Sequence, residues 1–223
     1  EKLKSFPDEI AKDLRGVQAQ LRRHEALEHE LSGAEQQLQA LVDAADEVLH
    51  QCTTQQSAAL QEKQQAVVEN WEMLRAKVDQ RREDLEQACK IQRFLAQARD
   101  YFSWSAELLR EMKVEEATRD SFMTDLKLTQ HQQLRAEIDA REETFEQVMA
   151  LGQEILHESY PSQDVRDKVT SLQDEKSGLY RQWELKRSWL ERMLLQQIFY
   201  RDISQMEKLM NSQEVSVVGD VAQ

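Results

Sequence analysis

The feature that most constrains the fold of this chain is a long stretch without helix-breaking residues. From Ser57 to Met112 the sequence contains no Gly and no Pro. The whole chain of 223 residues has five Gly and two Pro, the latter at Pro7 and Pro161. Because Gly and Pro disfavour helix interiors most strongly, the stretch predicts one continuous helix. At 1.5 Å per residue, this helix would be about 80 Å long.

Apolar residues recur at steps of three and four positions in four segments, which is the period of an amphipathic helix. The segments are 17–48, 57–112, 128–155 and 165–209. Breaks between them fall at 52–54, at 113–116 and before Tyr160-Pro161. Thr118 can cap the helix that follows the second break. The chain is therefore predicted to be all-α.

An internal repeat relates the two halves of the sequence. His24, Leu27, Leu31 and Leu38 match residues 107 positions later, which are His131, Leu134, Ile138 and Phe145. The string Glu-Val-Leu-His at 47–50 likewise matches Glu-Ile-Leu-His at 154–157. Trp71 and Trp183 are 112 positions apart, and the excess of five predicts a longer loop around 159–161. Such a period indicates a tandem-repeat architecture.

The repeat length predicts how the helices pack. A helix with a narrow apolar stripe needs neighbours to bury it, and about 107 residues accommodate three antiparallel helices and their loops. Each unit is then a left-handed three-helix bundle whose last helix continues into the first helix of the next unit. We expect residues 8–91 to supply the last two helices of one unit, 92–195 a complete unit, and 196–223 the start of a third.

The largest side chains on the apolar stripes are the expected core. This set comprises His24, Leu31, Trp71, Phe94, Trp104, His131, Ile138, Phe145, Trp183 and Phe199. Replacing Trp71 or Trp183 by Ala is expected to cost about 3–5 kcal/mol. The two imidazoles are interpreted as packing groups, because neither has a ligand three or four residues away that would complete a metal site.

Composition and motifs disfavour several classes of function. The net charge of −13 opposes binding to nucleic acid or to an anionic membrane surface. No nucleotide-binding, zinc-hydrolase or serine-elbow motif occurs, so we expect neither an enzyme nor a cofactor or metal site. The sequence contains no run of eighteen apolar residues, so no membrane span is predicted and any membrane association is expected to be indirect. Cys52 and Cys89 lack metal-type spacing, which fits a reducing, cytosolic setting.

Particular strings resemble a known family. The segment from Trp71, WEMLRAKVDQRREDLEQACKIQRFLAQARDYFSW, resembles the last helix of one spectrin repeat continuing into the first helix of the next. Two further strings are similar to the last full repeat of β-spectrin chains: HQQLRAEIDAREETFEQVMALGQEIL and QWELKRSWLERMLLQQIFYRDISQMEKLMNSQE. The resemblance covers residues 7–212.

This resemblance implies a function. A β-spectrin segment would be an elastic spacer in the cytoskeleton at the cell cortex, pairing laterally with α-spectrin, while other parts of the parent protein bind actin and ankyrin. Two alternatives remain open: a dedicated interaction module for an adaptor, motor or lipid, and a parallel coiled-coil dimer that acts as a tether.

The spacing between a tryptophan and the phenylalanine that follows it differs between the two helical junctions. Trp71 precedes Phe94 by 23 residues, whereas Trp183 precedes Phe199 by 16, a difference of one heptad. Removing a heptad keeps the same face buried, so the downstream junction is expected to be helical but shorter. Leu209 stands where Trp104 stands in the first copy, which predicts a less tightly anchored bundle at that end.

Overall fold

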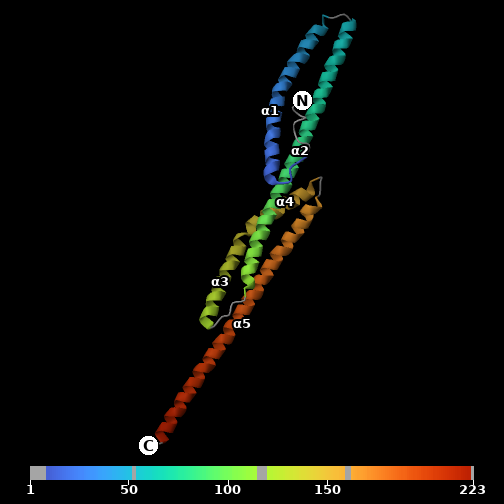
Figure 1. Ribbon diagram of the computed structural model, residues 1–223. Coiled ribbons are helices and arrows are strands. Elements are labelled where there is room, and N and C mark those ends of the chain that lie inside the picture. Colours follow the sequence, from blue (N-terminus) through green and yellow to red (C-terminus); the bar gives the residue numbers. More distant parts are fainter. Residues whose placement is uncertain (1–8, 52–53, 115–119, 159–161, 222–223) are drawn as a thin grey trace. The chain divides into compact units, whose positions relative to one another are not determined.

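The computed structural model describes residues 9–51, 54–114, 120–158 and 162–221, with residues 54–55 and 214–221 described by their backbone alone (Figure 1). Five helices account for nearly all of these residues, and these ranges contain no strand. The helices are α1 (Leu14–Leu49), α2 (Thr54–Lys113), α3 (Ser121–Ala140), α4 (Glu142–His157) and α5 (Gln163–Val221). The all-α prediction is confirmed. So is the continuous helix expected over 57–112, which is α2.

The chain divides into two compact units, residues 1–96 and 97–223. Unit 1 contains α1 and the first part of α2. Unit 2 contains the end of α2 together with α3, α4 and α5. Each unit is described by itself below.

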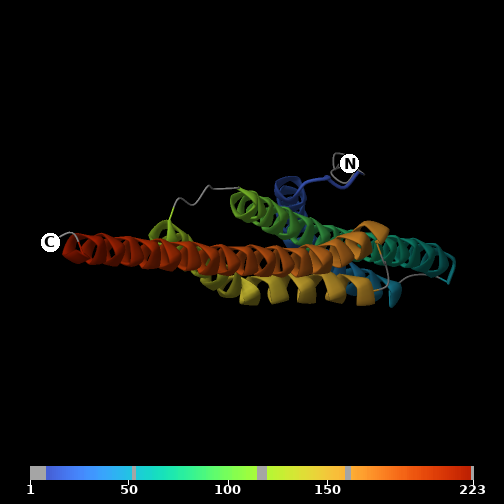
Figure 2. The same ribbon diagram turned by 90° about the horizontal axis from the view of Figure 1, so that it is seen from below.

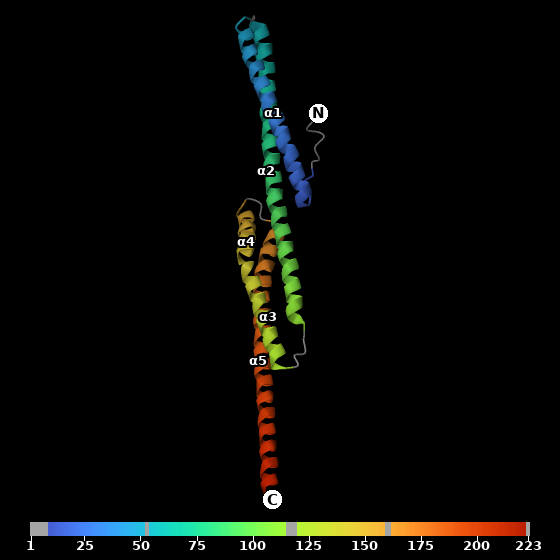
Figure 3. The same ribbon diagram turned by 90° about the vertical axis from the view of Figure 1, so that its left-hand side faces the viewer.

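Unit 1 is a helical hairpin, in which α1 lies beside the first part of α2 (Figure 3). The side chain of Asp13 caps α1 by accepting a hydrogen bond of 2.8 Å from the backbone N–H of Gly16. Both helices contribute buried apolar side chains; they include Val17 and Leu27 of α1 and Val78 and Leu85 of α2.

Unit 2 has three layers of helix: the end of α2, the α3–α4 pair, and α5. Figure 2 shows α3 and α4 lying along the first part of α5. One core cluster draws from all three layers and consists of Leu108, Met112, Ile138, Leu179 and Trp183. The side chain of Asp120 caps α3 by accepting from the N–H of Met123 at 2.8 Å. Thr118, the predicted cap, lies outside the described residues.

A single residue separates α3 from α4, where the sequence predicts one helix over 118–158. Arg141 has φ −92° and ψ 0°, and its N–H bonds to Ile138 O at 3.1 Å, three residues back instead of four. This tighter bond ends α3, and α4 restarts at Glu142. The repeat counterpart of Arg141 is Ala34, which lies inside the unbroken α1.

The second half of α5 is not packed by any described element. Every side chain from Phe199 to Gln213 is exposed, and Phe199 and Leu209 are 61% and 63% accessible. The expectation that Phe199 is a core residue is therefore wrong for this structure, because no described helix lies against this face of α5. The looser packing expected beside Leu209 agrees with this exposure.

Candidate functional site, an interhelical contact network

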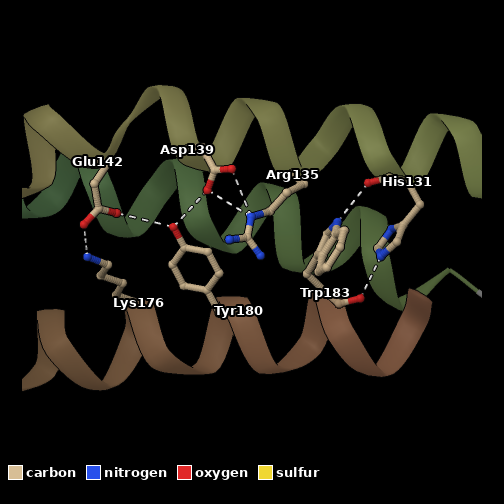
Figure 4. A network of polar contacts seen from close by, with 7 residues as sticks. All are labelled: His131, Arg135, Asp139, Glu142, Lys176, Tyr180 and Trp183. Carbon is tan, nitrogen blue, oxygen red and sulfur yellow. Dashed lines mark hydrogen bonds and ion pairs between the residues drawn. The ribbon is translucent and has the colours of Figure 1, made fainter. Parts of the chain in front are cut away.

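The densest set of specific contacts lies in unit 2, between α5 and the α3–α4 pair (Figure 4). His131 of α3 donates from Nε2 to the carbonyl oxygen of Trp183 at 2.7 Å. Trp183 of α5 donates from Nε1 to the carbonyl oxygen of His131 at 2.9 Å. The rings stack with centroids 5.2 Å apart and planes 10° apart. Because each side chain bonds the other residue's backbone, the pair fixes the register of α3 against α5.

The environment of His131 favours the neutral imidazole. Both rings are buried, with 4% of His131 and 7% of Trp183 accessible. Burial lowers the pKa of His131, and the positive charges of Lys186 and Arg187 lower it further, whereas the hydrogen bond to Trp183 acts in the opposite direction. A neutral imidazole therefore suits this contact.

The network continues along α3 through Arg135. Its Nε donates to the carboxylate of Asp139 at 2.9 and 3.0 Å. The guanidinium carbon lies 4.7 Å from the ring centroid of Tyr180 and 5.2 Å from that of Trp183. Arg135 thus contributes both an ion pair on its own helix and cation–π contacts to α5.

Tyr180 connects α3 and α4 across the break. Its hydroxyl oxygen lies 3.2 Å from Oδ1 of Asp139 at the end of α3 and 3.3 Å from Oε2 of Glu142 at the start of α4. Lys176, one turn earlier on α5, forms an ion pair with Glu142. Burial and then the charges of Glu142 and Asp139 raise the pKa of Tyr180 to about 12. The hydroxyl therefore remains a donor at neutral pH.

α2 contacts the other two layers through Trp104 and Ser105. The indole Nε1 of Trp104 donates to Glu137 of α3 at 2.9 Å, and the guanidinium of Arg141 lies 4.7 Å from the indole centroid. Ser105 is fully buried and donates to Oε1 of Glu175 on α5 at 2.6 Å. The break at Arg141 is thus contacted from α2 as well as from α5.

Unit 1 contains a counterpart of this network. His24 is buried and donates from Nε2 to the carbonyl oxygen of Val78 at 2.9 Å. Ion pairs link Glu28 to Arg82 and Glu35 to Arg75, joining α1 to α2. In both units, therefore, a buried imidazole donates a hydrogen bond to the backbone of a neighbouring helix.

These contacts correct the alignment of the second helix of each repeat. His24 and His131 are 107 positions apart, but their acceptors, Val78 and Trp183, are 105 apart. A second pair of contacts, Glu35 to Arg75 and Glu142 to Tyr180, gives the same result. The two glutamates are 107 positions apart, and their partners are 105 apart. Val78, and not Trp71, is therefore the counterpart of Trp183.

The corrected register changes two predictions. Phe94 and Phe199 are also 105 positions apart, so no heptad is missing between the units. The one-heptad difference arises because the two tryptophans occupy different heptads of the same stripe. The predicted shorter junction is therefore wrong. The stretch between α4 and α5, 158–162, is one residue longer than the stretch between α1 and α2, 50–53, so a longer loop does not account for the excess of five.

Comparisons with known proteins identify the family. The family model of the spectrin repeat matches residues 1–87 and 90–192. The chain belongs to the spectrin repeat family. It is 39% identical over 218 residues to "Spectrin beta chain, non-erythrocytic 5" of Homo sapiens, which covers 97% of this chain and 6% of that protein. "Spectrin beta chain" of Drosophila melanogaster is 28% identical over 96% of this chain and 9% of its own length.

The erythrocytic spectrin beta chain of Mus musculus is also 28% identical, over 96% of this chain and 10% of its own length. The chain thus spans about a tenth or less of the curated relatives it matches. It is a scaffold segment of a spectrin-type protein. Among the helices of the described residues, none is long and apolar enough to cross a membrane.

The spectrin repeat positions predicted as core differ in burial. Phe94, His24, Ile138, His131, Phe145 and Trp183 are buried. Leu31, Trp71 and Trp104 are half-buried. Leu31 and Trp71 line a groove of about 320 Å³ on the unit 1 hairpin. Within the described ranges, neither His24 nor His131 belongs to a group of three or more potential metal ligands.

Sequence analysis missed most of the polar network around the break. The missed residues are Arg135, Asp139, Glu142, Lys176 and Tyr180. The sequence does indicate one of them, because Glu142 lies 107 positions after Glu35 and so occupies the same repeat position. Without the helix register, however, the partner of either glutamate could not be chosen.

Proposed function

We propose that this chain is an elastic spacer and protein-interaction strut of a membrane-skeleton protein. The observation that carries the proposal is the pair of compact units connected by the unbroken α2. Each unit buries its own apolar side chains, so each can unfold and refold under load without requiring the other to do so.

The domain arrangement proposed for this spacer is a series of three-helix units. Residues 8–91 would supply two helices of one unit, 92–195 a complete unit, and 196–223 the first helix of another. Unit 1 supports this arrangement, because its two helices leave grooves that a third helix would cover. One groove lies at Trp71, and a second, apolar groove of about 140 Å³ lies at Leu38 and Val67. In unit 2 the end of α2 packs Leu108 and Met112 against α3 and α5.

The relatives support a set of partners. We propose lateral pairing with α-spectrin, and binding of actin and ankyrin by other parts of the parent protein. The setting would be the cytoplasm at the cell cortex, with only indirect membrane contact and no nucleic-acid partner. We further propose that the segment has no enzymatic activity and needs no cofactor.

Force spectroscopy on the full chain tests the spacer function. We expect the chain to extend in steps. One step should correspond to unfolding of unit 2 and should release a contour length equivalent to about 100 residues. Trp183→Ala should lower the force of this event and leave the unit 1 signal unchanged. A single event that releases both units together would contradict independent elasticity.

A binding experiment tests the partner. Purified chain should be retained by the region of α-spectrin that pairs laterally and not by the spectrin-binding region of ankyrin. Retention by ankyrin alone, or by neither, would contradict the proposed pairing.

One observation favours an alternative, a docking module for an adaptor or motor. The described part of α5 beyond Phe199 carries an exposed apolar stripe that includes Ile203, Met206 and Met210. Under this alternative, changing Phe199 and Ile203 to Ser would abolish adaptor or motor binding, whereas retention by α-spectrin would persist. A parallel dimeric tether would show twice the 26.2 kDa chain mass in sedimentation equilibrium.

A further inference from the structure

The two helices on either side of the Arg141 break are held by different chemistry. α3 buries Thr124, His131 and Ile138, of which two are polar. α4 buries Phe145, Val148, Met149 and Ile155 together with Gly152. Apolar burial therefore contributes more to holding α4, whereas α3 depends more on directional hydrogen bonds.

Packing beside α3 is incomplete. A groove of about 90 Å³ lies between α3, α5 and the end of α2, and Met112, His131 and Leu190 are among its lining residues. Nε of Arg187 is buried and has no hydrogen-bond partner among the described residues. On the outer side of α3, Phe122 is 75% accessible. An unpaired buried polar group lowers local stability, and a groove leaves the adjoining side chains with fewer protein contacts.

Several hydrogen bonds hold α3 to α2 and α5. Thr124 donates to Gln197, His131 and Trp183 exchange bonds, and Trp104 donates to Glu137. All of these contacts lie before Arg141, where the regular helical hydrogen bonding changes. Tyr180 and Lys176 contact Glu142 at the start of α4, and Tyr180 also contacts Asp139 near the end of α3.

The charges around His131 oppose its protonation. Basic groups come from α3, namely Lys127 and Arg135, and from α5, namely Lys186 and Arg187. α2 contributes an acidic group, Glu111, which lines the same groove. Arg135 is paired with Asp139, and Arg187 with Glu184 and Glu191. A charged imidazole would therefore be desolvated, and the positive charges of Lys186 and Arg187 would repel it. An open α3 would return it to water.

We propose that α3 opens from α2 and α5 as a separate segment bounded by Arg141, that α4 stays packed against α5 during this opening, and that mild acid favours the open form. The folded state binds fewer protons at His131 than the open state does. The stability of the closed form is therefore fully present above the ordinary histidine range and decreases as pH falls through it.

Hydrogen exchange of the full chain, resolved by mass spectrometry of peptides, tests this proposal. After correction for the intrinsic pH dependence of exchange, amides of 121–140 should exchange at least about tenfold faster than those of 142–157 at neutral pH. The ratio should increase as pH is lowered from about 7.5 to 5. Equal protection of the two segments at every pH would overturn the proposal.

His131→Gln tests the role of the imidazole, because the amide can still donate to the Trp183 carbonyl but does not titrate in this range. The variant should remove the pH dependence of the exchange ratio. His24→Gln is the matched control, since His24 holds the same repeat position in the unbroken α1, and it should leave exchange of α3 unchanged. Persistence of the full pH dependence in His131→Gln would overturn the acid response.

Arg141→Ala tests the boundary. Ala is the residue at the equivalent position of α1, and it has the highest helix propensity. The variant should extend one helix across the break, so that 121–140 and 142–157 exchange with a common protection factor. If the two segments still exchange at their separate wild-type rates, Arg141 is not the boundary.

Discussion

At the residue scale, Trp183 and Trp71 have different roles although the sequence presents them as equivalents. Trp183 is buried, stacks on His131 and donates to its backbone. Trp71 is half-buried and lines the groove of unit 1. Its register counterpart on α5 is Lys176, whose ammonium lies 4.5 Å from the ring centroid of Phe145. The two indoles should therefore contribute unequally to stability.

Alanine substitution measures this inequality. Trp183→Ala should lower the free energy of unfolding by about 3–5 kcal/mol, because it empties a buried site. Trp71→Ala should cost only about 1–2 kcal/mol, because much of this ring is already in water. The measurement is urea denaturation followed by circular dichroism, with Trp183→Phe as a control that keeps an aromatic ring. Equal losses for the two alanine variants would contradict the assigned register.

The sequence could predict which side chains lie on the apolar stripes but not which atoms they bond. His24 and His131 were expected to pack, and both are buried. Their carbonyl acceptors lie on another helix, so identifying them requires the register of two antiparallel helices. An error of one heptad leaves the buried face unchanged and is therefore invisible to periodicity.

At the scale of the element, helix ends marked by breakers were predictable and the break at Arg141 was not. α2 and α5 extend through the stretches where the sequence lacks strong stop signals. Ala140, Arg141 and Glu142 are all good helix formers. The contacts of Arg141 with Trp104, and of Tyr180 with the helices on both sides, come from other elements, and local propensity cannot report them.

Glycine substitution should stabilise α5. A Cβ placed on Gly178, in the interior of α5, would meet no atom within 4 Å. Gly178→Ala should therefore raise the free energy of unfolding of unit 2 by about 0.5–1 kcal/mol and its melting temperature by a few degrees. Thermal melts followed by circular dichroism provide the measurement.

Gly16→Ala is the opposing control. A Cβ there would lie 2.7 Å from Cβ of Ala11 and 2.9 Å from Oδ2 of Asp13, the side chain that caps α1. This variant should destabilise unit 1, by up to about 2 kcal/mol if the cap is lost. A gain in stability from Gly16→Ala, or a loss from Gly178→Ala, would contradict the packing described for these helices.

At the scale of the whole molecule, the described side chains divide into two packed cores and an unpacked length of helix. The cores lie within residues 1–96 and 97–223, and burial on α5 ends before Phe199. Sequence periodicity continues through Ile203 and Leu209, so it could not indicate that these residues would be exposed. Burial depends on a partner helix, and periodicity shows only which face would need one.

Ending the chain at Ile198 tests this division. The melting temperature of unit 2 should change by no more than a few degrees, because the described side chains beyond this point are exposed. Helical circular dichroism should fall, since that length of helix is removed. A loss of more than about 2 kcal/mol in the stability of unit 2 would show that the end of α5 contributes to its core.

The corrected register also implies that dissolved salt affects the two units unequally. Unit 1 joins its helices by the opposite charges of Glu28 and Arg82. At the equivalent positions of unit 2, Arg135 and Arg187 carry like charges, both within 5.5 Å of the Trp183 ring centroid. Screening over a Debye length of about 8 Å at physiological ionic strength weakens attraction and repulsion alike. Salt should therefore weaken the contacts of unit 1, whereas in unit 2 it screens the repulsion between Arg135 and Arg187 together with the attraction between Glu142 and Lys176. Unit 1 should lose more stability than unit 2 as ionic strength rises.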